Sequence, residues 1–278
     1  MDLTVRAEEL GDELRGLRER AGLSLERAGE QIDASATKMS RIENGLREGS
    51  AEDVSALLAI YGCGGPRRAE LLTLAREVER RGWWQRNKPD FAERQRTLIG
   101  LEAKADLIVN FEGMHIPGLL QTGEYTRALM NECGMVPTIE IEGRMVTRMR
   151  RHAVLLKERP PRLIALIDEL VLHRMIGGPD VVRRQLEHLV EAACLPNTTL
   201  RVVPNSGAHA ASAGAFELVR RPAGHKVVFL ENLTSSLFLE EPQEIETYEQ
   251  AIRLLLARAL SAEESVRLIT ELTWEATE

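Results

Sequence analysis

Apolar residues recur with a helical period along residues 10–80 of the chain, starting with Leu10, Leu14 and Leu17. Residues that can cap a helix N-terminus stand before three further apolar runs, at Ser24, Ser35 and Ser50. The pair at 44–45, Asn-Gly, is typical of a helix that ends on a left-handed residue. The pattern predicts a set of short helices with little strand.

The composition changes in residues 83–100, which are polar, basic and interrupted by Pro89. Such a stretch is typical of a linker, because it offers little apolar surface to a core. We therefore expect a hinge at 82–100 between an N-terminal helical domain, residues 1–81, and a larger domain, residues 101–278.

Short runs typical of strands alternate with helical patterns beyond the hinge. The expected strands lie within 105–111, 162–167, 199–203, 215–219, 226–231 and 236–240. The expected helices lie within 124–132, 140–156, 180–193, 244–259 and 263–274. Residues 216–230 resemble a hairpin with its turn at 221–225. The predicted fold class is mixed: an all-α domain followed by an α/β (α+β) domain with a small mixed sheet.

Charge and composition narrow the range of partners. The formal net charge is −7, so bulk charge gives no attraction to DNA or to a membrane surface, and any nucleic-acid contact must come from a local patch. The N-terminus has no signal-peptide pattern, and no apolar run approaches the length of a membrane span. Cys63, Cys133 and Cys194 form no CxxC pair and are expected to be buried free thiols, which is consistent with a cytoplasmic protein.

Residues 31–45, QIDASATKMSRIENG, predict two short helices joined across the tripeptide at 33–35. The second helix carries its polar and apolar side chains on opposite sides: Thr37, Lys38, Ser40 and Arg41 against Met39 and Ile42. A helix that enters the DNA major groove needs short or positively charged hydrogen-bonding side chains on its outer face. Its N-terminal N–H groups can also approach phosphate. The stretch therefore predicts a DNA-reading helix-turn-helix, with packing or protein contact as the structural alternative.

The sequence from residue 10 to residue 62 resembles the Xre-type (lambda-repressor-like) helix-turn-helix domain of five helices, most clearly in SRIENG at 40–45. The resemblance implies base contacts from Ala36, Thr37 and Arg41, phosphate contacts from Ser24, Lys38, Asn44 and Arg47, and a DNA-facing surface that includes Ser35 and Ser40. It also implies an ion pair between Arg18 and Glu43. Few positive charges face DNA in this region, so we expect operator binding by a homodimer.

Two positions depart from that family's pattern. Residues 28–29 are Ala-Gly where the family usually has Leu-Ala, and Asp33 stands where the turn usually carries Gly. Glycine disfavours a helix by about 1 kcal/mol relative to alanine, and aspartate enters the left-handed region less readily than glycine. We expect these departures to reduce stability without removing a base-facing group.

The rest of the chain resembles the second domain of WhiJ-like, Scr-type antitoxin-like transcriptional regulators of actinobacteria. The resemblance rests on MHIPGLLQTGEYTRALM at 114–130 and FLENLTSSLFLEEP at 229–242, among other segments. It implies an operator-binding transcriptional regulator with a small partner protein encoded nearby, and it leaves open an unknown small ligand. In the alternative, the chain mainly sequesters the small partner, and DNA binding is secondary.

Two segments of the second domain are candidates for contacts. The first could form the rim of a partner or ligand site: Pro117, Gly118, Leu119, Leu120, Gln121, Thr122 and Tyr125. A turn followed by a helix cap explains the same residues without any ligand. The second is a basic run at Arg148, Arg151, Lys157 and Arg159, which is either a second surface for DNA or an acidic partner, or, as charge runs usually are, a solvated face.

The sequence gives little support for a catalytic site. Ser206 and His209, with Asp168 or Glu169, could compose a triad, but no G-x-S-x-G sequence is present. The histidines form neither an i,i+4 pair nor an H-E-x-x-H motif, and no phosphate-binding glycine pattern follows a strand. We therefore expect no catalytic residues, no metal site, no cofactor and no enzymatic activity.

Overall fold

The computed structural model describes residues 5–45, 50–78, 91–222, 224–233 and 235–275. The chain divides into two compact units, the first consisting mainly of Met1–Gln85 and the second of Arg86–Leu237 with Glu241–Glu278.

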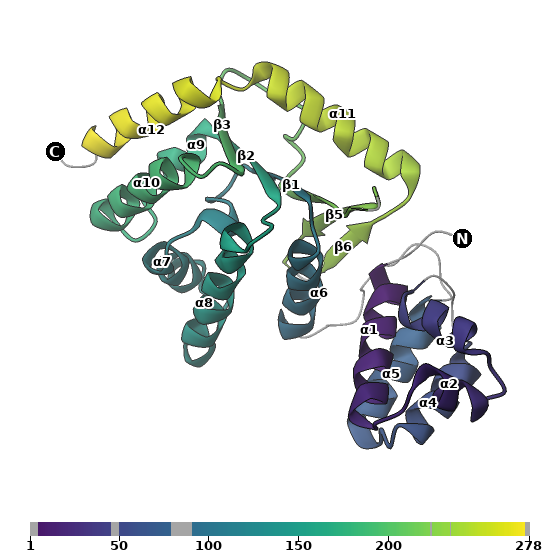
Figure 1. The fold of residues 1–278 in the computed structure, drawn as a ribbon. Coiled ribbons are helices and arrows are strands. Elements are labelled where there is room, and N and C mark those ends of the chain that lie inside the picture. Colours follow the sequence, from purple (N-terminus) through teal and green to yellow (C-terminus); the bar gives the residue numbers. More distant parts are fainter. Residues whose placement is uncertain (1–4, 46–49, 79–90, 223, 234, 276–278) are drawn as a thin grey trace. The chain divides into compact units, whose positions relative to one another are not determined.

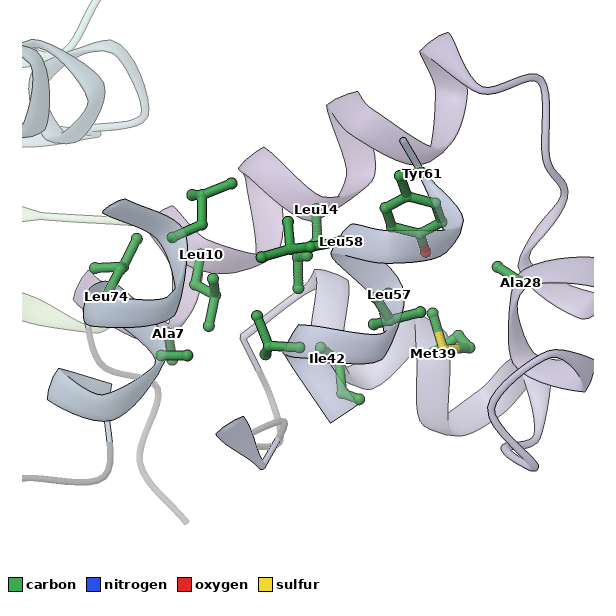
Figure 2. Packing of buried hydrophobic residues seen from close by; sticks show 13 residues of the cluster. Ala7, Leu10, Leu14, Ala28, Met39, Ile42, Leu57, Leu58, Tyr61 and Leu74 are labelled. Carbon is green, nitrogen blue, oxygen red and sulfur yellow. The ribbon is translucent and has the colours of Figure 1, made fainter. Parts of the chain in front are cut away.

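The described part of the first unit contains five helices: α1 (Val5–Arg20), α2 (Leu25–Glu30), α3 (Ala36–Glu43), α4 (Ala51–Ile60) and α5 (Gly65–Val78). Their apolar faces meet in one core (Figure 2), in which Leu14, Met39 and Leu57 are completely buried. The predicted caps are present, because the Oγ atoms of Ser24, Ser35 and Ser50 each accept a hydrogen bond from the backbone N–H three residues later. The all-α character predicted for this region is confirmed.

The second unit is an α/β domain (Figure 1). Its strands are β1 (Leu107–Glu112), β2 (Arg162–Asp168), β3 (Thr198–Val203), β4 (Phe216–Arg220), β5 (Lys226–Glu231) and β6 (Ser236–Leu239). Its helices are α6 (Phe91–Ala103), α7 (Gly123–Cys133), α8 (Thr138–His152), α9 (Glu169–Leu172), α10 (Pro179–Ala193), α11 (Pro242–Arg258) and α12 (Ala262–Glu275), with short 3₁₀ turns η1 (Gly118–Leu120) and η2 (Ala153–Leu156).

The strands of the described residues form one six-stranded sheet in the order β3-β2-β1-β4-β5-β6. Strands β1, β2 and β3 pair in parallel through helical crossovers, whereas β1 pairs antiparallel with β4, and β4 with β5. The β4–β5 hairpin confirms the one predicted at 216–230. Helix α12 packs against α10 and β3, and α11 packs against β3 and β5. The mixed sheet predicted from the alternating runs is confirmed.

The structure differs from two expectations drawn from the sequence, one about the hinge and one about the cysteines. Residues 82–90 of the predicted hinge lie outside the described residues, and 91–100 belong to α6, whose Leu98 and Leu101 are buried. The expectation of three buried thiols is wrong, because Cys133 and Cys194 are exposed at the ends of α7 and α10, where the core-facing stripe of each helix no longer includes them.

Candidate nucleic-acid interface

Helices α2 and α3 are joined by a tight turn whose backbone depends on Asp33. Its φ is 57°, and it is the only non-glycine residue with a positive φ among the described residues. Aspartate enters this region more readily than most residues, because its short side chain is polar and unbranched at Cβ. Asp33 therefore takes a left-handed turn position that favours glycine, and the sharp change of direction between α2 and α3 depends on it.

Gly29 is required by the same turn. Its carbonyl oxygen accepts hydrogen bonds from the N–H groups of Ile32 at 3.0 Å and Ala34 at 2.9 Å, so the chain folds back directly over α2. A Cβ atom at position 29 would lie 2.4 Å from the Ala34 carbonyl oxygen and 3.2 Å from the Met39 side chain. The expectation that Gly29 only weakens α2 is therefore wrong, since the close approach of α3 excludes any side chain here.

Helix α3 has two faces of different chemistry. Met39 and Ile42 point into the core and are 0% and 2% exposed. Thr37 and Arg41 lie one turn apart on the outer face, and both are exposed. Within the described residues, no group forms a hydrogen bond or ion pair with the Arg41 guanidinium, which leaves its planar donors available for an external acceptor such as a base edge.

A buried ion pair fixes the inner side of α3 to α1. Arg18 donates from Nε to Glu43 Oε1 at 2.7 Å and from Nη2 to Glu43 Oε2 at 2.9 Å, and Glu43 is only 2% exposed. Arg18 also donates to the Leu23 carbonyl oxygen at 2.9 Å, which ties the loop before α2 to the same group. The hydrogen bond to Glu43 raises the pKa of Arg18, so its guanidinium group stays charged.

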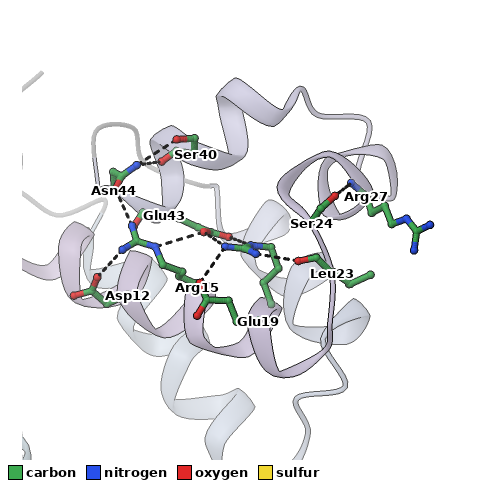
Figure 3. A network of polar contacts seen from close by, with 10 residues as sticks. Asp12, Arg15, Glu19, Leu23, Ser24, Arg27, Ser40, Glu43 and Asn44 are labelled. Carbon is green, nitrogen blue, oxygen red and sulfur yellow. Dashed lines mark hydrogen bonds and ion pairs between the residues drawn. The ribbon is translucent and has the colours of Figure 1, made fainter.

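The C-terminal end of α3 is held by Arg15, which sequence reasoning missed (Figure 3). Its Nη2 donates to the Glu43 carbonyl oxygen and to Asn44 Oδ1, each at 2.7 Å, while Asn44 Nδ2 donates to the Ser40 carbonyl oxygen at 2.7 Å. The side chain predicted near phosphate at Asn44 is thus already engaged in the helix cap. Arg15 precedes Arg18 by one helical turn, and this spacing is the signal that could have identified it.

Other residues that were predicted to contact DNA also have partners within the protein. Lys38 Nζ lies 2.8 Å from Asp53 Oδ2 on α4, so this ammonium group has an internal partner. Ser24 and Ser35 use their hydroxyl groups as helix caps, and Ala36 and Ser40 are partly exposed on the outer side of α3. Arg47 lies outside the described residues. Asp53 is the second residue that the sequence did not reveal, since nothing along the chain indicates that α4 begins beside α3.

Helix α3 differs from its neighbours in the charge of its first turn. Glu8 stands in the first turn of α1, Glu26 in that of α2, and Glu52 and Asp53 in that of α4, whereas the first turn of α3 has no acidic residue. Acidic side chains neutralise the positive end of a helix dipole, and α3 shares with α5 a first turn that carries none of its own, although Asp53 of α4 pairs with Lys38 there.

The candidate contact segment of the second unit is mostly interior. Gln121 is 0% exposed and Tyr125 is 2% exposed, and Pro117, Leu119 and Leu120 are buried as well. Gln121 donates to the Ile116 carbonyl oxygen at 2.7 Å and accepts from Arg148 at 2.9 Å. Thr122 caps α7 by accepting from the Tyr125 N–H. Only Gly118 and Thr122 retain partial exposure, so a partner can reach little of this segment from outside.

The basic run forms the expected solvated face only in part, because Arg151 is buried, whereas Arg159 is exposed and Arg148 and Lys157 are partly exposed. Arg151 is 6% exposed and donates to Glu102 Oε2 at 2.9 Å and to Oε1 at 2.5 Å. Lys157 Nζ donates to the Ala103 carbonyl oxygen at 2.7 Å, so both cations fasten the end of α6. The prediction was wrong for Arg151, because its acidic partner lies 49 positions away in sequence, on another helix.

Carboxyl groups on neighbouring strands complete this buried cluster. Glu217 on β4 is 6% exposed and opposes Asn110 of β1, and Glu112 follows two residues later on the same face. Burial raises the pKa of Glu112 to about 8, with the nearby Glu231 adding to the rise. Burial likewise raises the pKa of Glu217 well above its usual range, with the charge of Glu102 adding to it. Glu112 therefore favours the protonated form at neutral pH, and burial shifts the equilibrium of Glu217 in the same direction.

Residues 95–271 match the family model described as a domain of unknown function (DUF5753). The chain belongs to the DUF5753 family. In this DUF5753 protein the N-terminal residues 9–71 match a second model, described as a helix-turn-helix domain, which covers the α2–turn–α3 unit. The matches give the DUF5753 chain a helix-turn-helix domain followed by an α/β domain. Comparison with curated proteins gave no match, and neither did comparison with solved structures.

The DUF5753 domain does not assemble the imagined triad. His209 Nε2 lies 3.0 Å from Asp168 Oδ2, and the ring Nδ1 accepts from the Ala211 N–H at 3.2 Å. Ser206 Oγ accepts instead from Arg258 at 2.9 Å. Both ring nitrogens are thus used, and in the described residues no hydroxyl group bonds to the His209 ring. The Asp168–His209 contact holds the 204–214 loop against the end of β2.

None of the helices in the described residues of the DUF5753 chain combines the length and the apolar character needed to cross a membrane. No three histidine, cysteine, aspartate or glutamate side chains among these residues lie close enough together to hold a metal ion.

Proposed function

We propose that the chain is a sequence-specific DNA-binding transcriptional regulator of the Xre type. The observation that carries the proposal is the outer face of α3, where Thr37 and Arg41 are exposed one turn apart and Arg41 has no partner among the described residues. Arginine donates to guanine O6 and N7 in the major groove, and threonine can contact either a base edge or a thymine methyl group. The Arg18–Glu43 pair holds this face rigidly.

A single copy would bind DNA weakly. Lys38 and Asn44 are engaged internally, and the chain carries a net charge of −7, so few cations remain for phosphate. We propose that a homodimer supplies two copies of α3, which must be about 34 Å apart to enter successive major grooves on one side of the duplex. This pairing compensates for the weak contact that each copy makes.

In this proposal the DUF5753 domain supplies the dimer contacts and receives a small partner protein or ligand, as in antitoxin-like regulators of actinobacteria. Its buried Glu102–Arg151 pair fastens α6, the first described element after residues 79–90, to the rest of the domain. A signal that changes the position of α6 would change the spacing of the two reading helices and hence operator affinity. Partner binding that leaves operator affinity unchanged would contradict this mechanism.

One observation favours the alternative, in which the chain mainly holds a small protein partner. Ile139 is 92% exposed and Val146, two turns later on α8, is 43% exposed, with Met135 at 69% just before the helix. Exposed apolar side chains on one helix face are typical of a protein contact. Under this alternative, Ile139→Asp would abolish partner capture by the full-length chain and leave any DNA binding unchanged.

The test of the main proposal is selection of DNA by the full-length chain from a pool of genomic fragments, followed by sequencing. We expect enrichment of an inverted repeat whose half-sites are one helical turn apart. Arg41→Ala should lose the enrichment, whereas Arg253→Ala, which removes an exposed arginine on α11, should keep it. Absence of any enriched motif at low ionic strength would contradict the proposal.

A further inference from the structure

The first turns of α3 and α4 are tied together by one ion pair. Lys38 is the third residue of α3 and Asp53 the third residue of α4, and each donates its backbone N–H to the serine that caps its own helix. Between them, Lys38 Nζ lies 2.8 Å from Asp53 Oδ2. The two side chains are 26% and 22% exposed, so the pair is open to solvent at one side.

This pair changes what Lys38 can do toward DNA. A phosphate that approaches the first turn of α3 meets an ammonium group already neutralised by a carboxylate, and it must compete with Asp53 for the N–H donors of Lys38. Glu52 in the same turn of α4 adds a second negative charge nearby. Sequence-independent DNA affinity comes chiefly from cations that replace counterions on phosphate, so neutralising one of them lowers affinity for every sequence.

We propose that Asp53 limits DNA affinity by competing with phosphate for Lys38. The inference rests on the proposed DNA-binding function and adds a regulating residue to it. Asp53 sets the strength of binding without contributing to the choice of sequence, which stays with the Thr37–Arg41 face. A weakly binding single copy then depends on its partner copy for stable operator occupancy.

The experiment is a double-mutant cycle on the full-length chain with a random-sequence duplex long enough for one dimer, measured by fluorescence anisotropy across a salt series. Asp53→Asn should raise affinity about two- to five-fold at low salt, the range expected when one half-exposed ion pair no longer competes. It should also steepen the dependence of log K on log salt by about 0.9, the contribution of one added phosphate contact.

Glu52→Gln is the matched control. It removes the same charge one residue away, from an exposed side chain that forms no ion pair with Lys38 in the part of the chain that the structure describes, and it should change affinity less than Asp53→Asn. In the Lys38→Ala background, Asp53→Asn should give no gain, because the group that it releases is absent. A gain that persists without Lys38, or no gain beyond that of Glu52→Gln, would overturn the inference.

The outcomes separate this inference from the proposed function. If the wild-type chain binds DNA and Arg41→Ala removes its sequence preference, but Asp53→Asn has no effect, only the role of Asp53 fails. If Asp53→Asn lowers thermal stability and leaves DNA affinity unchanged, the pair is a structural tie between α3 and α4, and the inference is overturned. If no variant binds DNA at low salt, the proposed function and this inference fail together.

Discussion

The guanidinium group of Arg18 on α1 donates hydrogen bonds to both carboxylate oxygens of Glu43, the last residue of α3, at 2.7 and 2.9 Å. This contact joins the first helix of the domain to the helix proposed to read DNA. Because Glu43 is only 2% exposed, the pair is shielded from water and from salt. The orientation of α3 therefore depends on a contact on its inner side, away from the face that is proposed to read DNA.

Arg18→Ala is expected to destabilise the first unit by about 3 kcal/mol, because it leaves the buried Glu43 carboxylate without its main partner. Hydrogen exchange of the α1 and α3 amides measures the loss. Arg67→Ala serves as the control, since it removes a half-exposed pair with Glu13 and should cost at most about 1 kcal/mol. Equal losses for the two variants would show that burial of the Glu43 pair has no special importance.

Gly29→Ala is expected to destabilise α2 and α3 by about 1–3 kcal/mol, because the added methyl group would lie 2.4 Å from the Ala34 carbonyl oxygen. The same substitution at Gly16 in α1 meets only the end of the flexible Arg20 side chain, at 3.4 Å. There it should stabilise by up to about 1 kcal/mol through helix propensity. Chemical denaturation compares the two variants, and a stabilising Gly29→Ala would refute the close approach.

The sequence was a reliable guide wherever structure depends on neighbours along the chain. The caps at Ser24, Ser35 and Thr122 and the β4–β5 hairpin were predicted because a few adjacent residues determine them. Contacts between distant elements were not predictable in this way. Lys38 pairs with Asp53 on another helix, and Arg151 pairs with Glu102 on another helix. Arg151 is therefore buried, although its place in a basic run had predicted an exposed side chain.

Arg151→Ala is expected to cost about 3–5 kcal/mol of stability in the DUF5753 domain, because Glu102, 1% exposed, would lose its buried counter-charge. Faster hydrogen exchange should be strongest in α6, which carries Glu102. The control Arg183→Ala breaks an exposed pair with Glu187 on α10 and should change stability by no more than about 0.5 kcal/mol. Unchanged exchange in α6 after Arg151→Ala would contradict the anchoring role.

The buried carboxyl group of Glu112 predicts that the DUF5753 domain loses stability as the pH rises. Its pKa is about 8 in the folded chain against an ordinary 4.5, so the folded state keeps a proton that the unfolded state has released. The stabilising effect is complete below pH 4.5 and is lost as the pH rises through 8. His152, whose pKa burial lowers to about 4 from 6.5, acts in the opposite direction below pH 6.5.

The range from pH 6.5 to 8 therefore isolates the effect of Glu112 from that of His152. Urea denaturation should show a loss across this range that is about 2 kcal/mol larger for the wild-type chain than for Glu112→Gln, which keeps the pH dependence due to Glu217. The variant keeps the shape of the side chain and abolishes its ionisation. A wild-type chain and a Glu112→Gln variant with the same pH dependence would contradict the assignment.

If the outer face of α3 reads base edges through Arg41, the loss of Arg41 must weaken binding to a selected fragment more than binding to a random duplex. Anisotropy titrations of the wild-type chain, Arg41→Ala and Arg41→Lys on both DNAs at one salt concentration give the ratio of affinities. Arg41→Ala should cost roughly 1–3 kcal/mol on the selected fragment and much less on random DNA, and lysine should not restore the preference. Equal losses on both DNAs would contradict the claim.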